Sequence, residues 1–349
     1  MRVKLGDVCE RGTSNLKLSD VSEKNGEFSV FGASGYIGSV DFYQQGYPYV
    51  AVVKDGAGIG RAMLCPGKTS VIGTMQYLLP KDNILPKYLF YVVKYMNLEK
   101  YFTGATIPHI YFKDYKNEEF NFDFWERQVE IVSVLSKCEK VIDLCKQELQ
   151  LLDKLIKARF VELFGDPVSN SYGLPEATLP DLGEFGRGVS KHRPRNDIKL
   201  LGGKYPLIQT GDVANAGLYI TSYSSTYSEL GLKQSKMWDK GTLCITIAAN
   251  IAKTAILEFD ACFPDSVVGF IANERTNNIF VHYWFSFFQA ILESQAPESA
   301  QKNINLKILS ELKVIVPEKR KQDQFASFVK LTDNQKRLVH TNAIWRKVL

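Results

Sequence analysis

Hydrophobic residues follow two different spacings along this chain. Residues 1–125 contain short apolar or alternating runs, such as 49–53 and 71–79, separated by glycine and proline turns. Runs of this kind predict short β-strands, because alternate side chains of a strand point to opposite faces. Residues 88–101 have helical spacing instead. The first third of the chain is therefore expected to be mostly β with one helix.

The spacing changes at residue 126. From 126 to 164 there is neither Gly nor Pro, and apolar residues recur alternately three and four positions apart, which predicts a long helix with a coiled-coil seam. At 1.5 Å per residue this helix would be roughly 58 Å long, more than either flanking region could contain, so we expect it to connect two domains. Its opposite charges balance, which favours protein partners over DNA. The seam residues are Ile131, Val134, Cys138, Val141, Cys145, Leu149, Leu152, Ile156, Phe160 and Leu163.

The region after this helix repeats the region before it. Residues 103–110 have a counterpart in 297–304, and 126–128 have one in 320–322, in both cases 194 positions later. Near the start of each domain, residues 5–8 correspond to 179–182, which lie only 174 positions later. The second copy therefore carries about 20 extra residues between these two points of the repeat. We expect the insertion around 218–230.

The repeat and the two spacings together predict an α+β protein in which two mostly β domains alternate with two long helices. The second helix is shorter than the first and its apolar residues are less regularly spaced. The expected segments are a first domain at 1–125, a spacer helix at 126–166, a second domain at 167–318 and a second helix at 319–349.

Composition is that of an ordinary soluble protein, with 45% hydrophobic and 23% charged residues. No apolar run is long enough to cross a bilayer and the start of the chain does not resemble a signal peptide, so we expect a cytoplasmic protein without membrane contact. The six cysteines form no C-x-x-C pair, which argues against a zinc site or a disulfide framework. A net charge of +5 suits an anionic partner without identifying one.

A glycine-rich stretch at 55–60 follows a predicted strand, as in loops that bind nucleotides or S-adenosylmethionine. That chemistry requires a helix to begin at the last glycine, so that its N–H groups face the ligand. The sequence instead continues to Pro66 and Gly67, and the equivalent stretch of the second copy, 247–252, has no glycine. The pattern therefore favours a turn between two strands.

Other catalytic or metal-binding patterns are weak. The four histidines, at 109, 192, 282 and 340, are not at metal-ligand spacing. Asp265 and Glu274 are similar to a nuclease carboxylate pair, but the lysine that such sites use is absent, and chance explains the pair better. We expect no metal site and no catalytic residue.

Polar and basic residues of the predicted loops are the candidates for DNA contact. The densest group lies at 187–195, where donors could meet phosphates or a guanine edge, although a charge run taken alone is better explained as a solvated loop. Other candidates recur in both copies, such as His109 and Asn303, or flank the glycine stretch. The full set is Lys54, Arg61, Thr106, His109, Lys113, Arg187, Lys191, His192, Arg193, Arg195, Thr210, Asn250, Lys253, Lys302 and Asn303.

The module order and several stretches resemble one known family, the specificity (S) subunits of type I restriction-modification systems. The stretches are Val3-Lys4-Leu5-Gly6-Asp7-Val8, the helix start at 126–131, the helix end at 151–160, and 205–213. The resemblance covers nearly the whole chain, and it is specific only in combination with the internal repeat.

The resemblance implies two target-recognition domains, each reading one half of a split double-stranded DNA site in the major groove. It also implies that the helices pack as an antiparallel coiled coil, which relates the repeats by a pseudo-twofold axis and places the half-sites roughly 10 base pairs apart. The implied partners are two methyltransferase subunits and restriction subunits. S-adenosylmethionine, ATP and Mg²⁺ would be bound by those partners, with no cofactor in this chain.

Two other functions stay open at this point. The chain could be a DNA methyltransferase, or a fragment of a restriction-methylation fusion, that uses the glycine stretch at 55–60. It could also be a coiled-coil scaffold that binds no DNA. One departure from the family pattern is the short second helix at 319–349, expected to reflect either a truncation or a short variant.

Overall fold

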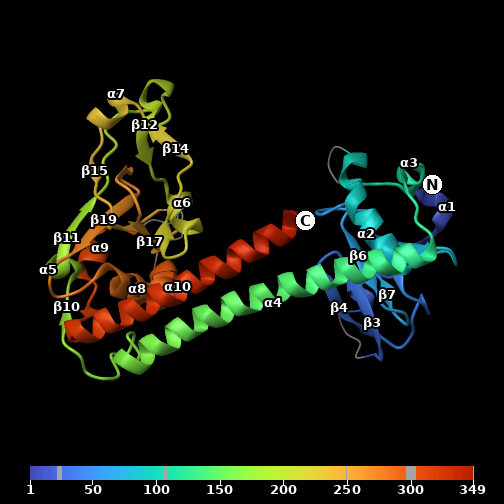
Figure 1. The fold of residues 1–349 in the computed structure, drawn as a ribbon, viewed down its shortest axis with the longest axis horizontal. Helices are drawn as coiled ribbons and strands as arrows, with labels where there is room; N and C mark the ends of the chain where they lie inside the picture. The colour runs from blue at the N-terminus through green and yellow to red at the C-terminus, as the bar shows by residue number, and fades with distance from the viewer. Residues whose placement is uncertain (22–25, 105–107, 249, 296–303, 349) are drawn as a thin grey trace. The chain divides into compact units, whose positions relative to one another are not determined.

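The chain divides into two compact units, Met1–Val141 and Ile142–Leu349 (Figure 1). The boundary lies within the long helix α4 (Trp125–Phe164), so α4 contributes residues to both units. No helix in the described part of the chain is both long and apolar enough to cross a membrane. The computed structural model describes residues 1–21, 26–104, 108–248, 250–295 and 304–348.

Unit 1 is built from short strands and few helices. Its strands are β1 (Arg2–Lys4), β2 (Cys9–Thr13), β3 (Phe28–Gly32), β4 (Gly35–Val40), β5 (Tyr49–Val53), β6 (Ala62–Cys65), β7 (Ser70–Val71), β8 (Met75–Pro80) and β9 (Glu119–Asn121). Its helices and 3-10 turns (η) are α1 (Leu5–Val8), η1 (Leu18–Asp20), α2 (Pro86–Met96), η2 (Leu98–Tyr101), α3 (Phe112–Tyr115) and the first part of α4. The strands form sheets in the orders β2-β8-β5-β6, β4-β3-β7 and β1-β9.

Strand β5 forms the centre of unit 1 because both of its faces are covered. Val50 and Val52 belong to an apolar cluster that includes residues of α2, whereas Ala51 belongs to a cluster on the opposite face. This alternation follows from the two-residue period of a strand. The helix predicted at 88–101 is interrupted after Met96, because Asn97 takes a left-handed conformation with a φ of 49°.

Unit 2 has the same kind of architecture with more elements. Its strands are β10 (Glu176–Ala177), β11 (Gly183–Arg187), β12 (Leu201–Leu207), β13 (Tyr219–Ile220), β14 (Ser225–Tyr227), β15 (Met237–Trp238), β16 (Leu243–Thr246), β17 (Thr254–Leu257), β18 (Ala261–Cys262), β19 (Val267–Ala272) and β20 (Val314–Ile315). Its helices are the rest of α4, α5 (Leu179–Leu182), η3 (Ile198–Leu200), α6 (Thr210–Asn215), α7 (Glu229–Lys233), α8 (Asn278–Gln295), α9 (Leu306–Glu311) and α10 (Lys319–Val348). The sheet orders are β11-β19-β16-β17-β13, β14-β12-β18-β15 and β10-β20.

The two units share one strand order, which confirms the predicted internal repeat. The sheet β2-β8-β5-β6 of unit 1 corresponds to β11-β19-β16-β17 of unit 2, and β4-β3-β7 corresponds to β14-β12-β18. Strand directions agree as well, since β3 pairs parallel with β7, and β12 pairs parallel with β18. The pair β1-β9 has its counterpart in β10-β20.

The insertion in the second copy begins earlier than predicted. A tight connection at residues 33–34 joins β3 to β4, whereas residues 208–224 separate β12 from β14 and contain α6 and β13. Strand β13 pairs parallel with β17 and widens that sheet. The predicted range of 218–230 covers part of the extra residues. They are divided between two connections, because residues 228–242 between β14 and β16 also exceed their counterpart, 41–48 between β4 and β5.

Both long helices form, and within unit 2 they run antiparallel. Phe160 of α4 packs against Phe325 near the start of α10, with ring centroids 5.3 Å apart. Asp153, earlier in α4, forms an ion pair with Lys336, later in α10. Contacts that occur in opposite order along the two helices define an antiparallel pair.

The predicted seam of α4 is not buried along its whole length. Ile156 and Phe160 are fully buried in the apolar core of unit 2, whereas Val134 is 53% exposed. Cys138 and Cys145 are only half-buried. Regular spacing shows that residues share one face of a helix, but it does not show what covers that face.

Candidate nucleic-acid interface

The densest group of predicted contact residues lies on one exposed loop of unit 2, residues 188–197, called the basic loop below. The loop leaves the sheet at Gly188, whose N–H donates to the carbonyl of Val267, and the N–H of Val189 donates to the carbonyl of Phe263. A Cβ at position 188 would lie 2.3 Å from the carbonyl oxygen of Phe263, so only glycine allows this close approach. The predicted residues of the loop, Lys191, His192, Arg193 and Arg195, are exposed, and so is Arg187 at the end of β11.

Two carboxylates lie among these cations. Nη2 of Arg193 lies 3.4 Å from Oδ2 of Asp265, and Nη2 of Arg195 forms an ion pair with Oδ1 of the same carboxylate. Nε2 of His192 lies 3.2 Å from Oδ2 of Asp197. The pKa of Asp197 is lowered, first by the backbone N–H of Lys199 and then by His192. Both arginines of the basic loop are therefore held by the same carboxylate.

The glycine stretch of unit 1 is a turn between two antiparallel strands. Strand β6 begins at Ala62, directly after the turn, and no helix begins at its last glycine. The N–H of Gly60 donates to the carbonyl of Val53, and the N–H of Gly56 donates to the carbonyl of Pro108. N–H groups already used in this way cannot cradle a phosphate. The predicted strand-to-strand turn is confirmed.

This turn gathers several predicted residues of unit 1 around one carboxylate. Nδ1 of His109 lies 2.7 Å from Oδ1 of Asp55, and Nζ of Lys54 lies 3.4 Å from Oδ2. The imidazole of His109 stacks on Tyr111 with ring centroids 6.2 Å apart, and Nζ of Lys113 lies 5.4 Å from the centroid of the same ring. Lys54 thus joins His109 and Lys113, which come from a distant stretch of the chain, in one polar cluster.

The remaining predicted residues are dispersed or lie outside the described ranges. Nη1 of Arg61 donates to the carbonyl of Ala33, and Thr210 is the first residue of α6. Asn250 and Lys253 flank a turn that is closed by the hydroxyl of Thr246, and Asn250 is exposed. The residues outside the described ranges are Thr106, Lys302 and Asn303.

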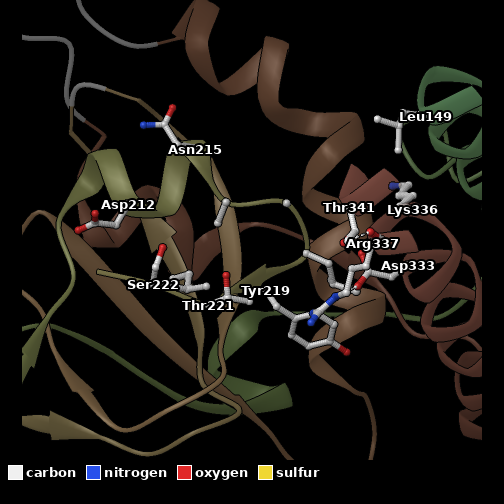
Figure 2. A pocket seen from close by; sticks show the side chains of 14 residues that line it. Leu149, Asp212, Asn215, Tyr219, Thr221, Ser222, Asp333, Lys336, Arg337 and Thr341 are labelled. Carbon is white, nitrogen blue, oxygen red and sulfur yellow. Dashed lines mark hydrogen bonds and ion pairs between the residues drawn. The ribbon is translucent and has the colours of Figure 1, made fainter. Parts of the chain in front are cut away.

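A cavity of about 780 Å³ in unit 2 lies between α6, β13 and α10 (Figure 2). Arg337 and Asp333 reach it from α10 and Tyr219 reaches it from β13 (Figure 2). These charged groups bind one another, which favours a structural role for the cavity. In the ranges that the structure describes, no group of three or more His, Cys, Asp or Glu side chains is placed to hold a metal ion.

The two repeated modules match a known family model. The model of the type I restriction modification DNA specificity domain matches residues 1–154 and again residues 176–343. The chain belongs to this family. Specificity subunits supply the DNA specificity of a type I restriction-modification system and are not catalytic, so this chain is a non-catalytic specificity subunit with two target-recognition domains.

Individual relatives agree with the family model. The protein described as the type I restriction enzyme MjaX specificity subunit of Methanocaldococcus jannaschii is 22% identical over 293 residues, which cover 79% of this chain and 69% of the relative. The MjaIX specificity subunit of the same organism is 26% identical over 179 residues, covering 46% of this chain and 40% of the relative.

Solved structures show the same fold. The S subunit of the type I restriction-modification system of M. genitalium superposes with a TM-score of 0.65 at 17% identity, covering 100% of this chain and 93% of that one. A chain from a structural study of the assembly and conformational transition of the type I R-M system gives a TM-score of 0.50 at 14% identity, covering 99% and 94% of the two chains.

Residues that organise both clusters of this specificity subunit were not predicted. Asp55 contacts Lys54 and His109, Asp265 contacts two arginines, and the ring of Tyr111 contacts both His109 and Lys113. The similarity of Asp265 to a nuclease carboxylate is best explained by chance, and no local pattern in the sequence connects this residue with the two arginines. Its role became visible only with the arginines beside it.

Proposed function

We propose that this specificity subunit reads a bipartite double-stranded DNA site, with one half-site for each target-recognition domain. The observation that carries the proposal is the strand-for-strand repeat, in which the same sheets support loops of different sequence. A repeated scaffold with changed loops suits two readers of the same kind of ligand that differ in the bases they select.

The different polar clusters of the two domains support the proposal that each domain reads its own half-site. Unit 1 offers Lys54 and His109 beside Asp55 and Lys113 beside Tyr111, whereas unit 2 offers Arg193 and Arg195 beside Asp265. Lysine and histidine suit phosphates and single acceptors, while the planar fork of arginine suits the paired acceptors of a guanine edge. Two domains that carry such different side chains are expected to read different half-sites, roughly 10 base pairs apart.

We also propose that the chain positions two methyltransferase subunits and the restriction subunits on this site, in the cytoplasm where the DNA lies. S-adenosylmethionine, ATP and Mg²⁺ would then act in those subunits. The closed glycine turn supports this view, because the N–H groups of Gly56 and Gly60 already have acceptors within unit 1.

The proposal is tested by mapping DNA methylation in the host with and without this gene. We expect one bipartite adenine-methylation motif to disappear on deletion and to return when the intact gene is supplied. Exchange of the loop residues of one domain should then change one half of the motif only. Loss of no motif on deletion would overturn the proposal.

Neither of the two other functions is favoured by an observation in the structure, and each has a direct check. Binding of S-adenosylmethionine to the chain alone, measured by calorimetry at submillimolar affinity, would support a methyltransferase. DNA affinity and a salt dependence that are unchanged after replacement of both Arg193 and Arg195 would support a scaffold without DNA contact, because each lost phosphate contact should lower the salt slope by about 0.9.

A further inference from the structure

Asp265 occupies a fixed position at the base of the basic loop. It lies between Phe263 and Val267, which are both fully buried. The N–H of Val267 donates to the carbonyl of Pro264, which closes a turn around the aspartate. Because the basic loop is hydrogen-bonded to this same segment through Gly188, the carboxylate and the loop form one unit.

The two arginines use this carboxylate in different ways. Arg193 directs Nη1 to the backbone carbonyl of His192, 2.9 Å away, and Nη2 to Asp265, so both of its terminal nitrogens are engaged. Arg195 contacts the carboxylate through Nη2, and its side chain is 45% exposed. Oδ1 of Asp265, the oxygen that faces Arg195, is shielded from solvent and accepts no hydrogen bond from the described residues, so its contact with Arg195 is an ion pair. Arg195 is thus paired with the carboxylate through one nitrogen, and among the described residues its other nitrogens donate no hydrogen bond.

We propose that Asp265 is a positioning residue that aims the guanidinium of Arg195 at a guanine edge in the half-site read by the second domain. This inference rests on the proposed function. A guanidinium has five N–H donors in a fixed plane, so fixing one corner of the fork determines where the remaining donors point. Those donors match the O6 and N7 acceptors that guanine presents in the major groove.

Because Asp265 is charged, a positioning role and a purely electrostatic effect on DNA binding predict different results when the charge is removed. A carboxylate beside DNA repels phosphates, so its removal should strengthen binding to DNA of any sequence. If the carboxylate also aims Arg195, its removal should weaken the preference for one base pair. Tighter non-specific binding together with poorer discrimination is the signature of a positioning residue.

The first domain lacks this arrangement. Strands β8 and β19 occupy equivalent places in their sheets, and they begin at Met75 and Val267. The position two residues before the start of each strand is Gly73 in the first domain and Asp265 in the second. A change at Asp265 should therefore affect only the half-site of the second domain.

The experiment uses the full chain assembled with its methyltransferase subunits. The rate of methylation is measured on the natural site and on sites with each single base-pair change, and binding to unrelated DNA is measured across salt concentrations. The variants are Asp265→Asn, Asp265→Glu, Arg195→Gln and Arg195→Lys. Glu274→Gln is the matched control, because it removes the same charge from an exposed position in the same unit.

We expect Asp265→Asn to lose roughly tenfold in discrimination at one base pair of the second half-site, in line with the usual value of a bidentate base contact. Arg195→Gln and Arg195→Lys should lose discrimination at that same base pair, Asp265→Glu should restore part of it, and Glu274→Gln should keep it. Binding of unrelated DNA should rise for Asp265→Asn.

Several outcomes would overturn the inference. One is an equal change of affinity for all sequences, and another is a loss of discrimination in both half-sites together with a lower melting temperature. If Asp265→Asn does not fold, Arg195→Lys is compared with the wild type instead, because lysine keeps the positive charge and loses the planar fork of donors. Unchanged base-pair discrimination in Arg195→Lys would then refute the inference. Absence of bipartite methylation by the wild-type assembly would instead refute the proposed function, so the two failures are distinct.

Discussion

Nη2 of Arg337 in α10 lies 2.9 Å from Oε1 of Glu258, the residue that follows β17. Nε of Arg337 lies 2.9 Å from Oδ2 of Asp333, and its guanidinium lies 5.3 Å from the ring centroid of Tyr219. Tyr219 belongs to β13, which exists only in the longer second copy of the repeat. The insertion therefore supplies part of the surface on which α10 rests, and the hydrogen bond to Glu258 raises the pKa of Arg337.

Replacement of Arg337 by alanine should weaken this attachment modestly. The side chain is 46% exposed, so solvent screens its ion pairs and the free energy of unfolding should fall by about 1 kcal/mol at low salt. The loss should shrink in about 1 M salt, where charges are screened within a few ångströms. Arg320→Ala, at an exposed position of the same helix, is the control in chemical denaturation. An equal loss from both variants would contradict the prediction.

Phe160 should be among the most important residues for the stability of unit 2. Its ring is fully buried and lies within 5.3 Å, between centroids, of both Phe280 and Phe325. Phe160→Ala leaves a cavity among these rings and should lower the free energy of unfolding by about 3–5 kcal/mol. Leu151→Ala, on the same helix but 63% exposed, should change it by no more than about 0.5 kcal/mol. Urea denaturation followed by circular dichroism measures both.

Replacement of a glycine by alanine in the glycine turn should cost little stability at one position and much more at another. Gly56 and Gly60 both have a positive φ, but a Cβ at Gly60 would lie 2.5 Å from the backbone nitrogen of Glu99, whereas nothing lies within 4 Å at Gly56. Gly56→Ala should therefore cost about 1 kcal/mol of stability for the left-handed backbone alone, and Gly60→Ala about 2–4 kcal/mol. Thermal unfolding of the two variants should separate them clearly. Equal melting temperatures would show that the turn is not held as described.

Acid should destabilise unit 2 through His282. Burial of the imidazole, followed by the charge of Lys336, lowers the pKa of His282 to about 4, and its Nδ1 lies 2.9 Å from Oγ1 of Thr254. An unfolded histidine titrates near pH 6.5, so below that pH the unfolded chain binds a proton that the folded chain does not. The stabilising contribution is complete above about pH 6.5 and is lost as the pH falls towards about 4.

The size of this effect can be isolated with a neutral replacement. The free energy of unfolding of the wild type should fall by roughly 1–3 kcal/mol more than that of His282→Gln between pH 7 and pH 4.5. Denaturation curves at several pH values give the difference. Parallel pH profiles for the two proteins would show that His282 does not carry the proton linkage.

The amino-acid sequence by itself determined the repeat, the two long helices and the nature of the glycine stretch. These features follow from the local spacing of residues and from the constant displacement between the two copies, and both are properties of the linear sequence. The absence of a helix after Gly60 followed from Pro66 and Gly67 in the same way.

Only the tertiary structure decided which charges meet. Asp55 and His109 are 54 positions apart, and Asp265 and Arg193 are 72 positions apart, so no local pattern connects them. The same holds for α4, where regular spacing identified one apolar face but the packing of unit 2 decided that Phe160 is buried while Val134, in unit 1, is not. Side chains that share a face are fixed by the geometry of one helix, whereas their partners depend on how sheets and loops from distant parts of the chain come together.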